Sequence, residues 1–133
     1  MRFETKDDLI NEELAISLFC DIIKAKFEKL GEKEVDFKVI KGKIHFFVEV
    51  KGRNRNLKDA YPLPIAARKL VKLCDKGDGV IVWKCHDGII YGKVKNLYGK
   101  CRFSGRPSRQ GAFFDTEVMI YFDKQKGLKE LAA

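Results

Sequence analysis

The stretch Val35–Lys51 constrains the fold of this chain more than any other, because its pattern predicts a β-hairpin. β-Branched and aromatic residues fill both halves of the stretch, and Lys41-Gly42 marks the turn between them. Side chains alternate along a strand with period two, so those of the second half divide between two faces. One face carries Phe46, Val48 and Val50, and the other carries Phe47, Glu49 and Lys51. The apolar neighbours of Glu49 predict a central, buried strand, in which a carboxylate is unusual.

Two carboxylates and an amine are predicted to meet at the end of this hairpin. The hairpin brings Asp36 alongside Glu49, and Lys51 shares the face of Glu49. Carboxylate oxygens suit Mg²⁺, so the pattern predicts a metal site with an ammonium beside it. Two plainer interpretations stay open: an edge strand whose polar face meets solvent, and an aspartate that only bonds the backbone at a strand start.

These residues carry a resemblance to a known family. Asp36 followed by Glu49-Val50-Lys51 resembles the signature of the PD-(D/E)xK nuclease superfamily. The run VDFKVIKGKIHFFVEVKGR is similar to the small single-domain members, among them the archaeal-type Holliday junction resolvases. Those proteins begin with a helix whose glutamate points at the same site, and residues 11–15 here, NEELA, occupy such a helix. The resemblance extends over roughly residues 9–85.

The resemblance implies a restriction-endonuclease-like α/β core, with a central mixed sheet flanked by helices. It implies a metal-dependent endonuclease that hydrolyses phosphodiester bonds in DNA, including branched DNA such as Holliday junctions. Mg²⁺ is the implied cofactor, with Mn²⁺ as its substitute, and a homodimer is expected because junction cutters make paired incisions. The alternative function is a non-catalytic nucleic-acid-binding or interaction protein on the same fold. The chain departs from the resolvases in having Val35 before the aspartate instead of proline, and in leaving no apparent room for a strand between Leu30 and Asp36.

The implied catalytic residues are Glu12, Asp36, Glu49 and Lys51. The expected metal ligands are Asp36, Glu49 and the backbone carbonyl of Val50, because they supply the hard oxygen atoms that Mg²⁺ prefers. A bound divalent ion lowers the pKa of its water and neutralises charge on the phosphate. Lys51 is expected to orient the attacking water or to stabilise the phosphate.

The helix expected over residues 7–29 places one acidic residue within its apolar stripe. Apolar residues recur every seven positions along it, at Leu9, Ile16, Ile23 and Leu30. At about 100° per residue, Glu12 falls near the middle of this stripe and Glu13 near its edge. A carboxylate there is costly unless a metal or a lysine compensates it, which favours Glu12 as the helix glutamate. A solvated residue at the end of the stripe is the alternative.

The chain is basic, because 27 Lys and Arg against 19 Asp and Glu give a formal net charge of +8. Such a field attracts polyanions, so nucleic acid is the expected partner, although a bland basic surface gives the same sum. Basic residues are concentrated after Lys51 and in a long loop expected over residues 95–111, where Phe103 is placed to stack on a base. A merely solvated loop is the alternative. The predicted nucleic-acid contacts are Arg53, Arg55, Lys58, Lys100, Arg102, Arg106 and Arg109.

The remaining segments complete an α/β order. A second helix is expected over Ile65–Cys74, with Pro64 near its first turn. Short strands are expected over Val80–Trp83 and Ile89–Val94, the first of them parallel to an earlier strand through a crossover. A last strand is expected over Phe113–Phe122, followed by a short helix or frayed tail over residues 124–133.

Length and composition suit one globular nuclease-like domain over residues 1–133. The charged start of the chain, Met1–Asp8, does not resemble a signal peptide, and no apolar run is long enough to span a bilayer. We therefore expect a cytoplasmic protein with no membrane partner. The four cysteines are expected to be reduced thiols, mostly buried, since their spacings fit no familiar zinc pattern.

Overall fold

The computed structural model describes residues 6–31, 35–104 and 117–133. Its helices are α1 (Lys6–Ile23) and α2 (Ala67–Asp75). Its strands are β1 (Lys26–Lys29), β2 (Phe37–Lys41), β3 (Ile44–Gly52), β4 (Leu63–Ala66), β5 (Gly79–Cys85), β6 (Gly88–Lys93), β7 (Lys100–Ser104), β8 (Glu117–Phe122) and β9 (Lys129–Ala132).

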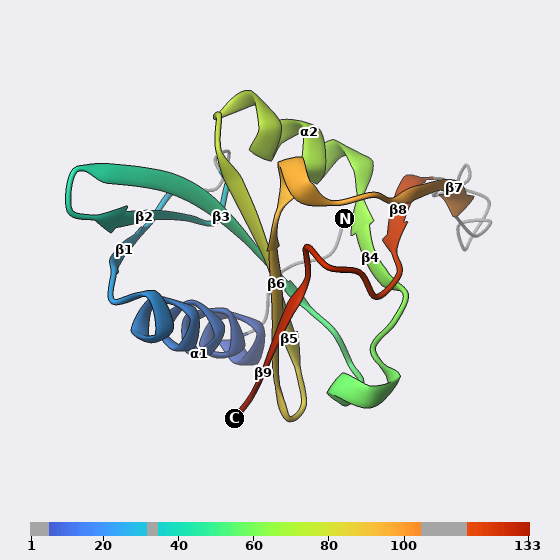
Figure 1. Ribbon diagram of the computed structural model, residues 1–133, viewed down its shortest axis with the longest axis horizontal. Coiled ribbons are helices and arrows are strands. Elements are labelled where there is room, and N and C mark those ends of the chain that lie inside the picture. The colour runs from blue at the N-terminus through green and yellow to red at the C-terminus, as the bar shows by residue number, and fades with distance from the viewer. Residues whose placement is uncertain (1–5, 32–34, 105–116) are drawn as a thin grey trace.

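The strands form two sheets. Six of them make a mixed sheet in the order β1-β2-β3-β5-β6-β9, in which β3 and β5 are parallel and the other neighbours antiparallel. The order β4-β8-β7 makes a smaller antiparallel sheet. Figure 1 shows α1 on one side of the large sheet, and α2 with the small sheet on the other. This α/β arrangement agrees with the restriction-endonuclease-like core expected from the sequence.

The predicted hairpin is confirmed. β2 and β3 pair antiparallel from Phe37 opposite Val48 to Lys41 opposite Ile44, and Gly42 takes the positive φ of 62° that the tight turn requires. A right-handed crossover is the usual route back to a parallel neighbour, and here the chain passes through β4 and α2 before β5 pairs with β3, as expected.

The two faces of β3 contribute to separate cores, as the alternation predicts. Val48 and Val50 pack with Ile16 and Phe19 of α1. Phe47, on the opposite face, joins the cluster under α2 and the small sheet. That cluster is organised around Trp83, which is 0% exposed and whose Nε1 donates a hydrogen bond to the Pro64 carbonyl at 2.9 Å. The large sheet is therefore covered on both faces, and an acidic side chain on β3 is enclosed.

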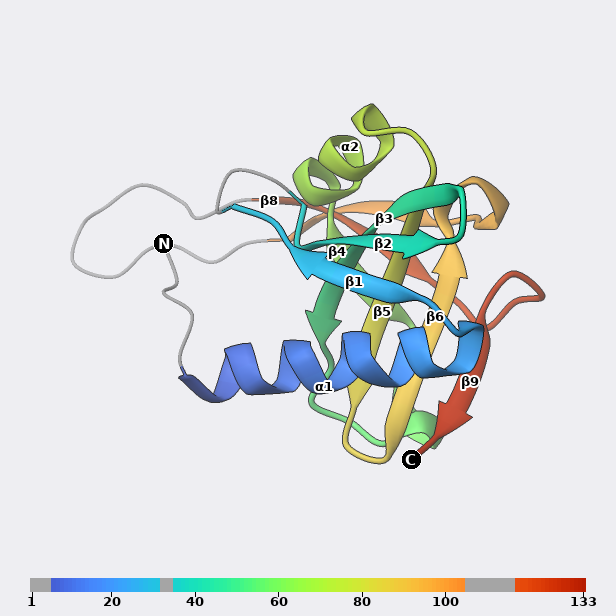
Figure 2. The ribbon, with the colours of Figure 1, turned by 90° about the vertical axis from the view of Figure 1, so that its left-hand side faces the viewer.

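α1 ends six residues earlier than predicted, and the difference changes the topology. Lys24 adopts a positive φ of 56°, and the N–H of Ala25 donates to the carbonyl of Cys20 at 2.9 Å. This bond is that of a Schellman C-cap, which normally uses glycine at the position of Lys24. The residues read as the last helical turn instead form β1, paired with β2. The strand that the sequence seemed to leave no room for is therefore present, as Figure 2 shows.

Three further segments differ from expectation because pairing between distant residues decides them. Residues 63–66 form β4, paired with β8, so the second helix begins at Ala67 and Pro64 lies in a strand. Residues 100–104 form β7 on the other side of β8, where a loop was expected. Residues 129–132 are strand β9 at the edge of the large sheet, and the prediction of a helix or frayed tail is wrong. Residues 113–116 of the expected last strand lie outside the described residues.

Of the four free thiols, Cys20 and Cys85 are buried, whereas Cys74 and Cys101 are exposed, so the expectation of mostly buried thiols holds for half of them. Burial, aided by Asp21, raises the pKa of the Cys20 thiol to about 11. Among the described residues, no helix is long and apolar enough to span a membrane.

Candidate active site

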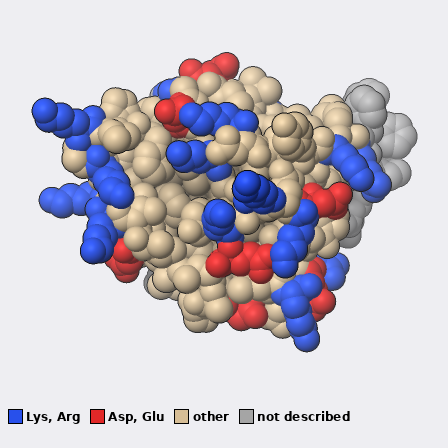
Figure 3. Space-filling view, in the orientation of Figure 1, with Lys and Arg blue, Asp and Glu red and all other residues tan. Residues whose placement is uncertain are grey.

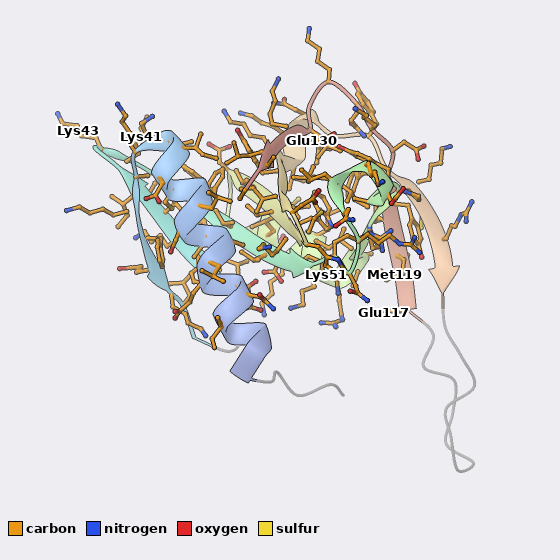
Figure 4. The ribbon with its side chains drawn as sticks, turned by 90° about the horizontal axis from the view of Figure 1, so that it is seen from below. Lys41, Lys43, Lys51, Glu117, Met119 and Glu130 are labelled. Carbon is orange, nitrogen blue, oxygen red and sulfur yellow. The ribbon has the colours of Figure 1, made fainter. Side chains whose placement is uncertain are left out.

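A cleft of about 860 Å³ opens where β3 ends, between the large sheet, α2 and the small sheet. Its walls come from segments distant in the sequence: the end of β3, the loop after it, the first turn of α2, β8 and the start of α1. Figure 4 shows Lys51 of β3 at this end together with Glu117 and Met119 of β8, whereas Lys41 and Lys43 lie at the opposite tip of the hairpin. The predicted acidic hairpin thus leads into a cleft.

Asp36 and Glu49 are brought together at the mouth of the hairpin. The N–H of Asp36 donates to Glu49 Oε2 at 3.3 Å, and the N–H of Val50 donates to Asp36 Oδ2 at 2.8 Å. β2 begins at Phe37, opposite Val48, so the Asp36 carboxylate supplies the acceptor that the strand itself no longer provides. Each acid is therefore held by the backbone of the neighbouring strand.

Glu49 is enclosed to a degree that is rare for a carboxylate. Only 4% of the surface of Glu49 is exposed, and Glu49 is the one buried charged residue in the described part of the chain. An ionised carboxylate in such a place needs a partner charge. The structure supplies one from a helix that the sequence analysis did not connect with the site.

That partner is Lys69, in the first turns of α2. Its Nζ lies 3.0 Å from Glu49 Oε1, and the Lys69 side chain keeps 43% of its surface exposed. Burial alone would lower the pKa of Lys69, but the negative charges of Glu49 and Asp36 outweigh it and leave the pKa raised. Sequence reasoning missed Lys69 because the expected helix was assigned only a covering role. The signal in the sequence that could have found it was a lysine in the helix that connects the two parallel strands.

Lys51 and Glu12 both line the cleft, but they reach it from different sides. Lys51 is exposed at the end of β3, on the same face as Glu49. Glu12 is half-buried near the start of α1, the helix on the opposite face of the sheet, and it also lines the cleft. Among the described residues, no three His, Cys, Asp or Glu side chains gather closely enough to hold a metal ion.

The loop after β3 is tied down along much of its length. Arg53 donates through Nε to the Ala60 carbonyl at 2.8 Å and through a terminal nitrogen to the Pro62 carbonyl at 3.3 Å. At the turn between β5 and β6, the Nε2 atom of the His86 ring lies 2.7 Å from the Asn54 side-chain oxygen. The backbone N–H of His86 donates to the Arg55 carbonyl at 2.9 Å. These bonds fix one wall of the cleft.

The other predicted nucleic-acid contacts are distributed unevenly. Arg55 and Lys58 are exposed on the loop just described. Lys100 and Arg102 lie on β7 instead of in a loop, with Lys100 paired to Asp123 at 3.5 Å and Arg102 placed 5.8 Å from the Tyr121 ring. Arg106 and Arg109 lie outside the described residues, and so does the side chain of Phe103.

Positive charge is not confined to one patch. On the face in Figure 3, Lys and Arg side chains are scattered over the surface with acidic groups between them. Within the cleft, Arg68 is paired with Glu117 and Lys69 with Glu49. On this face the positive charge is therefore spread out, and in the cleft these two basic side chains are paired with acids.

Comparison with known proteins gives one match. No curated protein and no solved structure matches the chain. A family model described as "Phage putative PDDEXK endonuclease" matches residues 1–128. With its acidic hairpin, E-x-K triplet and mixed sheet in place, the chain belongs to this family of PD-(D/E)xK nucleases.

Proposed function

We propose that this nuclease is a Mg²⁺-dependent endodeoxyribonuclease whose active site is the cleft at the end of β3. The observation that carries the proposal is a pair of hydrogen bonds at the mouth of the hairpin: the Asp36 N–H donates to Glu49, and the Val50 N–H donates to the Asp36 carboxylate. They hold the two carboxylates together next to the strand end where Glu49 and Lys51 line the cleft. The two carboxylates are thus preorganised in the absence of substrate, and catalysis requires such preorganisation to orient the reacting groups.

The donor atoms of the hairpin fit a divalent cation. Mg²⁺ prefers hard oxygen ligands and is usually bound by one or two carboxylates, with water and substrate phosphate completing its shell. Asp36 and Glu49 supply two such groups. In an extended strand the N–H and C=O of one residue point to the same side, so the Val50 carbonyl faces the side on which its N–H meets Asp36. When bound, the cation would activate a water and neutralise charge on the phosphate.

The surrounding residues have roles that do not depend on the cation. Lys51 presents an ammonium to a phosphate in the cleft and stabilises the charge that develops on its oxygens. Glu12 enters the same cleft from α1, where its carboxylate accepts a proton or orders a water at the rim. Arg55 and Lys58 extend the basic surface beyond the cleft, where they contact the phosphates of the DNA backbone.

DNA, including branched DNA such as a four-way junction, is the proposed substrate, and a homodimer the proposed assembly. Both rest on the similarity of the hairpin to small junction-cutting nucleases, in which two copies make paired incisions. A non-catalytic nucleic-acid-binding protein is the second candidate, favoured by Val35 in place of the proline that precedes the aspartate in the nuclease signature.

The deciding experiment compares cleavage of supercoiled plasmid and of a four-way junction in Mg²⁺ or Mn²⁺. Native protein is expected to cut, and Asp36→Asn and Lys51→Ala are each expected to lose about 100-fold or more of the rate. Lys43→Ala is the matched control, because it removes an exposed lysine at the opposite tip of the hairpin, outside the cleft. Equal activity in all four proteins would refute the proposed site. Salt-dependent DNA binding without cleavage or Mn²⁺ binding would establish the second candidate.

A further inference from the structure

The ion pair between Lys69 and Glu49 joins a mobile charge to a fixed one. Glu49 has its side chain 5% exposed and one carboxylate oxygen held by the Asp36 N–H. Lys69 reaches the other oxygen, at 3.0 Å, from the helix across the cleft, and nearly half of its side chain remains open to solvent. The four-carbon stem of lysine can swing away without moving the backbone, whereas Glu49 cannot leave the core.

A buried carboxylate requires positive charge nearby, and Lys69 supplies it from within the chain. A divalent cation on Glu49 would supply the same compensation with twice the charge. Two cations that bind the same carboxylate repel each other. Solvent around the exposed part of Lys69 weakens this repulsion without changing its sign.

We propose that Lys69 and the divalent cation compete as counter-ions for Glu49, so that Lys69 sets the affinity of the site for the metal. This inference rests on the proposed function, because it assumes that Glu49 is a metal ligand. When the cation takes Glu49, the Lys69 ammonium is displaced into the cleft, on the opposite wall from Lys51. The site then holds the cation only as tightly as its own internal amine allows.

Calorimetric titration with Mn²⁺ tests the competition in four proteins at neutral pH: native, Lys69→Met, Lys69→Arg and Lys72→Met. Lys69→Met is expected to bind Mn²⁺ about tenfold more tightly than native protein, since it removes the competing charge. Lys69→Arg keeps the charge, and Lys72→Met removes a lysine from the same helix outside the cleft, so both are expected to bind as native does. In a Glu49→Gln background the gain from Lys69→Met is expected to vanish.

Urea unfolding with chelator provides a second measurement. Lys69→Met is expected to be less stable than Lys72→Met, because Glu49 is left without its counter-ion, and saturating Mn²⁺ is expected to stabilise it by more than it stabilises native protein. Mn²⁺ affinity of Lys69→Met equal to or weaker than native would overturn the competition while leaving the metal site in place. Failure of both native and Lys69→Met proteins to bind Mn²⁺ would overturn the metal site of the proposed function, and the competition with it.

Discussion

The Asp36 carboxylate accepts a hydrogen bond from the N–H of Val50 at 2.8 Å, immediately before Phe37, the first residue of β2 to pair with β3. A carbonyl would normally occupy this position in an antiparallel ladder. The acid therefore ends the strand pairing and, by the same bond, is fixed beside Glu49. One side chain thus serves the fold and the proposed chemistry.

This double role separates two substitutions of Asp36. Asp36→Ala is expected to cost about 1–3 kcal/mol of unfolding free energy, because the N–H of Val50, a residue only 6% exposed, loses its acceptor. Asp36→Asn keeps an acceptor oxygen and is expected to retain most of the stability while losing cleavage. Urea denaturation of both variants measures the difference. Native stability in Asp36→Ala would show that the bond contributes nothing to the fold.

Arg53 and Arg55 were both predicted to contact nucleic acid, but the structure assigns them different environments. Arg53→Ala is expected to lower the unfolding free energy by about 1–3 kcal/mol, because its guanidinium holds the carbonyls of Ala60 and Pro62. Arg55→Ala, at an exposed position, is expected to leave stability within about 0.5 kcal/mol. It is expected instead to weaken DNA binding and to reduce the salt slope by about one.

Urea unfolding and DNA titration over a range of salt, both in the Asp36→Asn background, measure these two effects. A loss of DNA affinity in Arg53→Ala without any loss of stability would reverse the assignment.

Tyr61 is expected to make the stability of the fold sensitive to alkaline pH. Burial, followed by the hydrogen bond that its hydroxyl donates to Glu130 at 2.9 Å, raises the pKa of Tyr61 well above its usual value of about 10. The unfolded chain loses this proton near pH 10 while the folded chain keeps it, so this contribution is complete below about pH 10 and is lost as the pH rises further. Tyr61→Phe is expected to flatten the decline in unfolding free energy between about pH 9 and 11.

Glu130→Gln is the control for the charge, since it keeps an acceptor for the Tyr61 hydroxyl and removes the negative group. It is expected to give an intermediate slope, and Tyr61→Phe the flattest. Identical slopes in all three proteins would mean that other groups cause the alkaline loss.

Much of the fold could be predicted from local patterns. Alternation, turn residues and short apolar runs predicted the β2–β3 hairpin, the division of its side chains between two faces, the crossover to β5, and the positions of β5 and β6. The end of α1 could not be predicted, because Lys24 takes a left-handed conformation that glycine usually occupies. β9 was missed because a short edge strand forms only against its neighbour β6, and its own sequence carries little signal.

The candidate site was predictable to the same extent as the hairpin. Asp36 and Glu49 were expected side by side, and the structure brings them together. Lys69 was not expected, since its contact with Glu49 depends on how α2 packs over the sheet. Glu12 and Lys51 were expected at the same site, and both line the cleft.

By itself, the sequence determined which residues share a face of the central strand and that two acids and an amine stand at its end, because backbone geometry imposes an alternation of two on any strand. Only the tertiary structure decided what encloses those groups: an amine from α2, a cleft wall from β8, and a tied loop after β3. These neighbours are far apart along the chain, and only the packing of the second core brings them together.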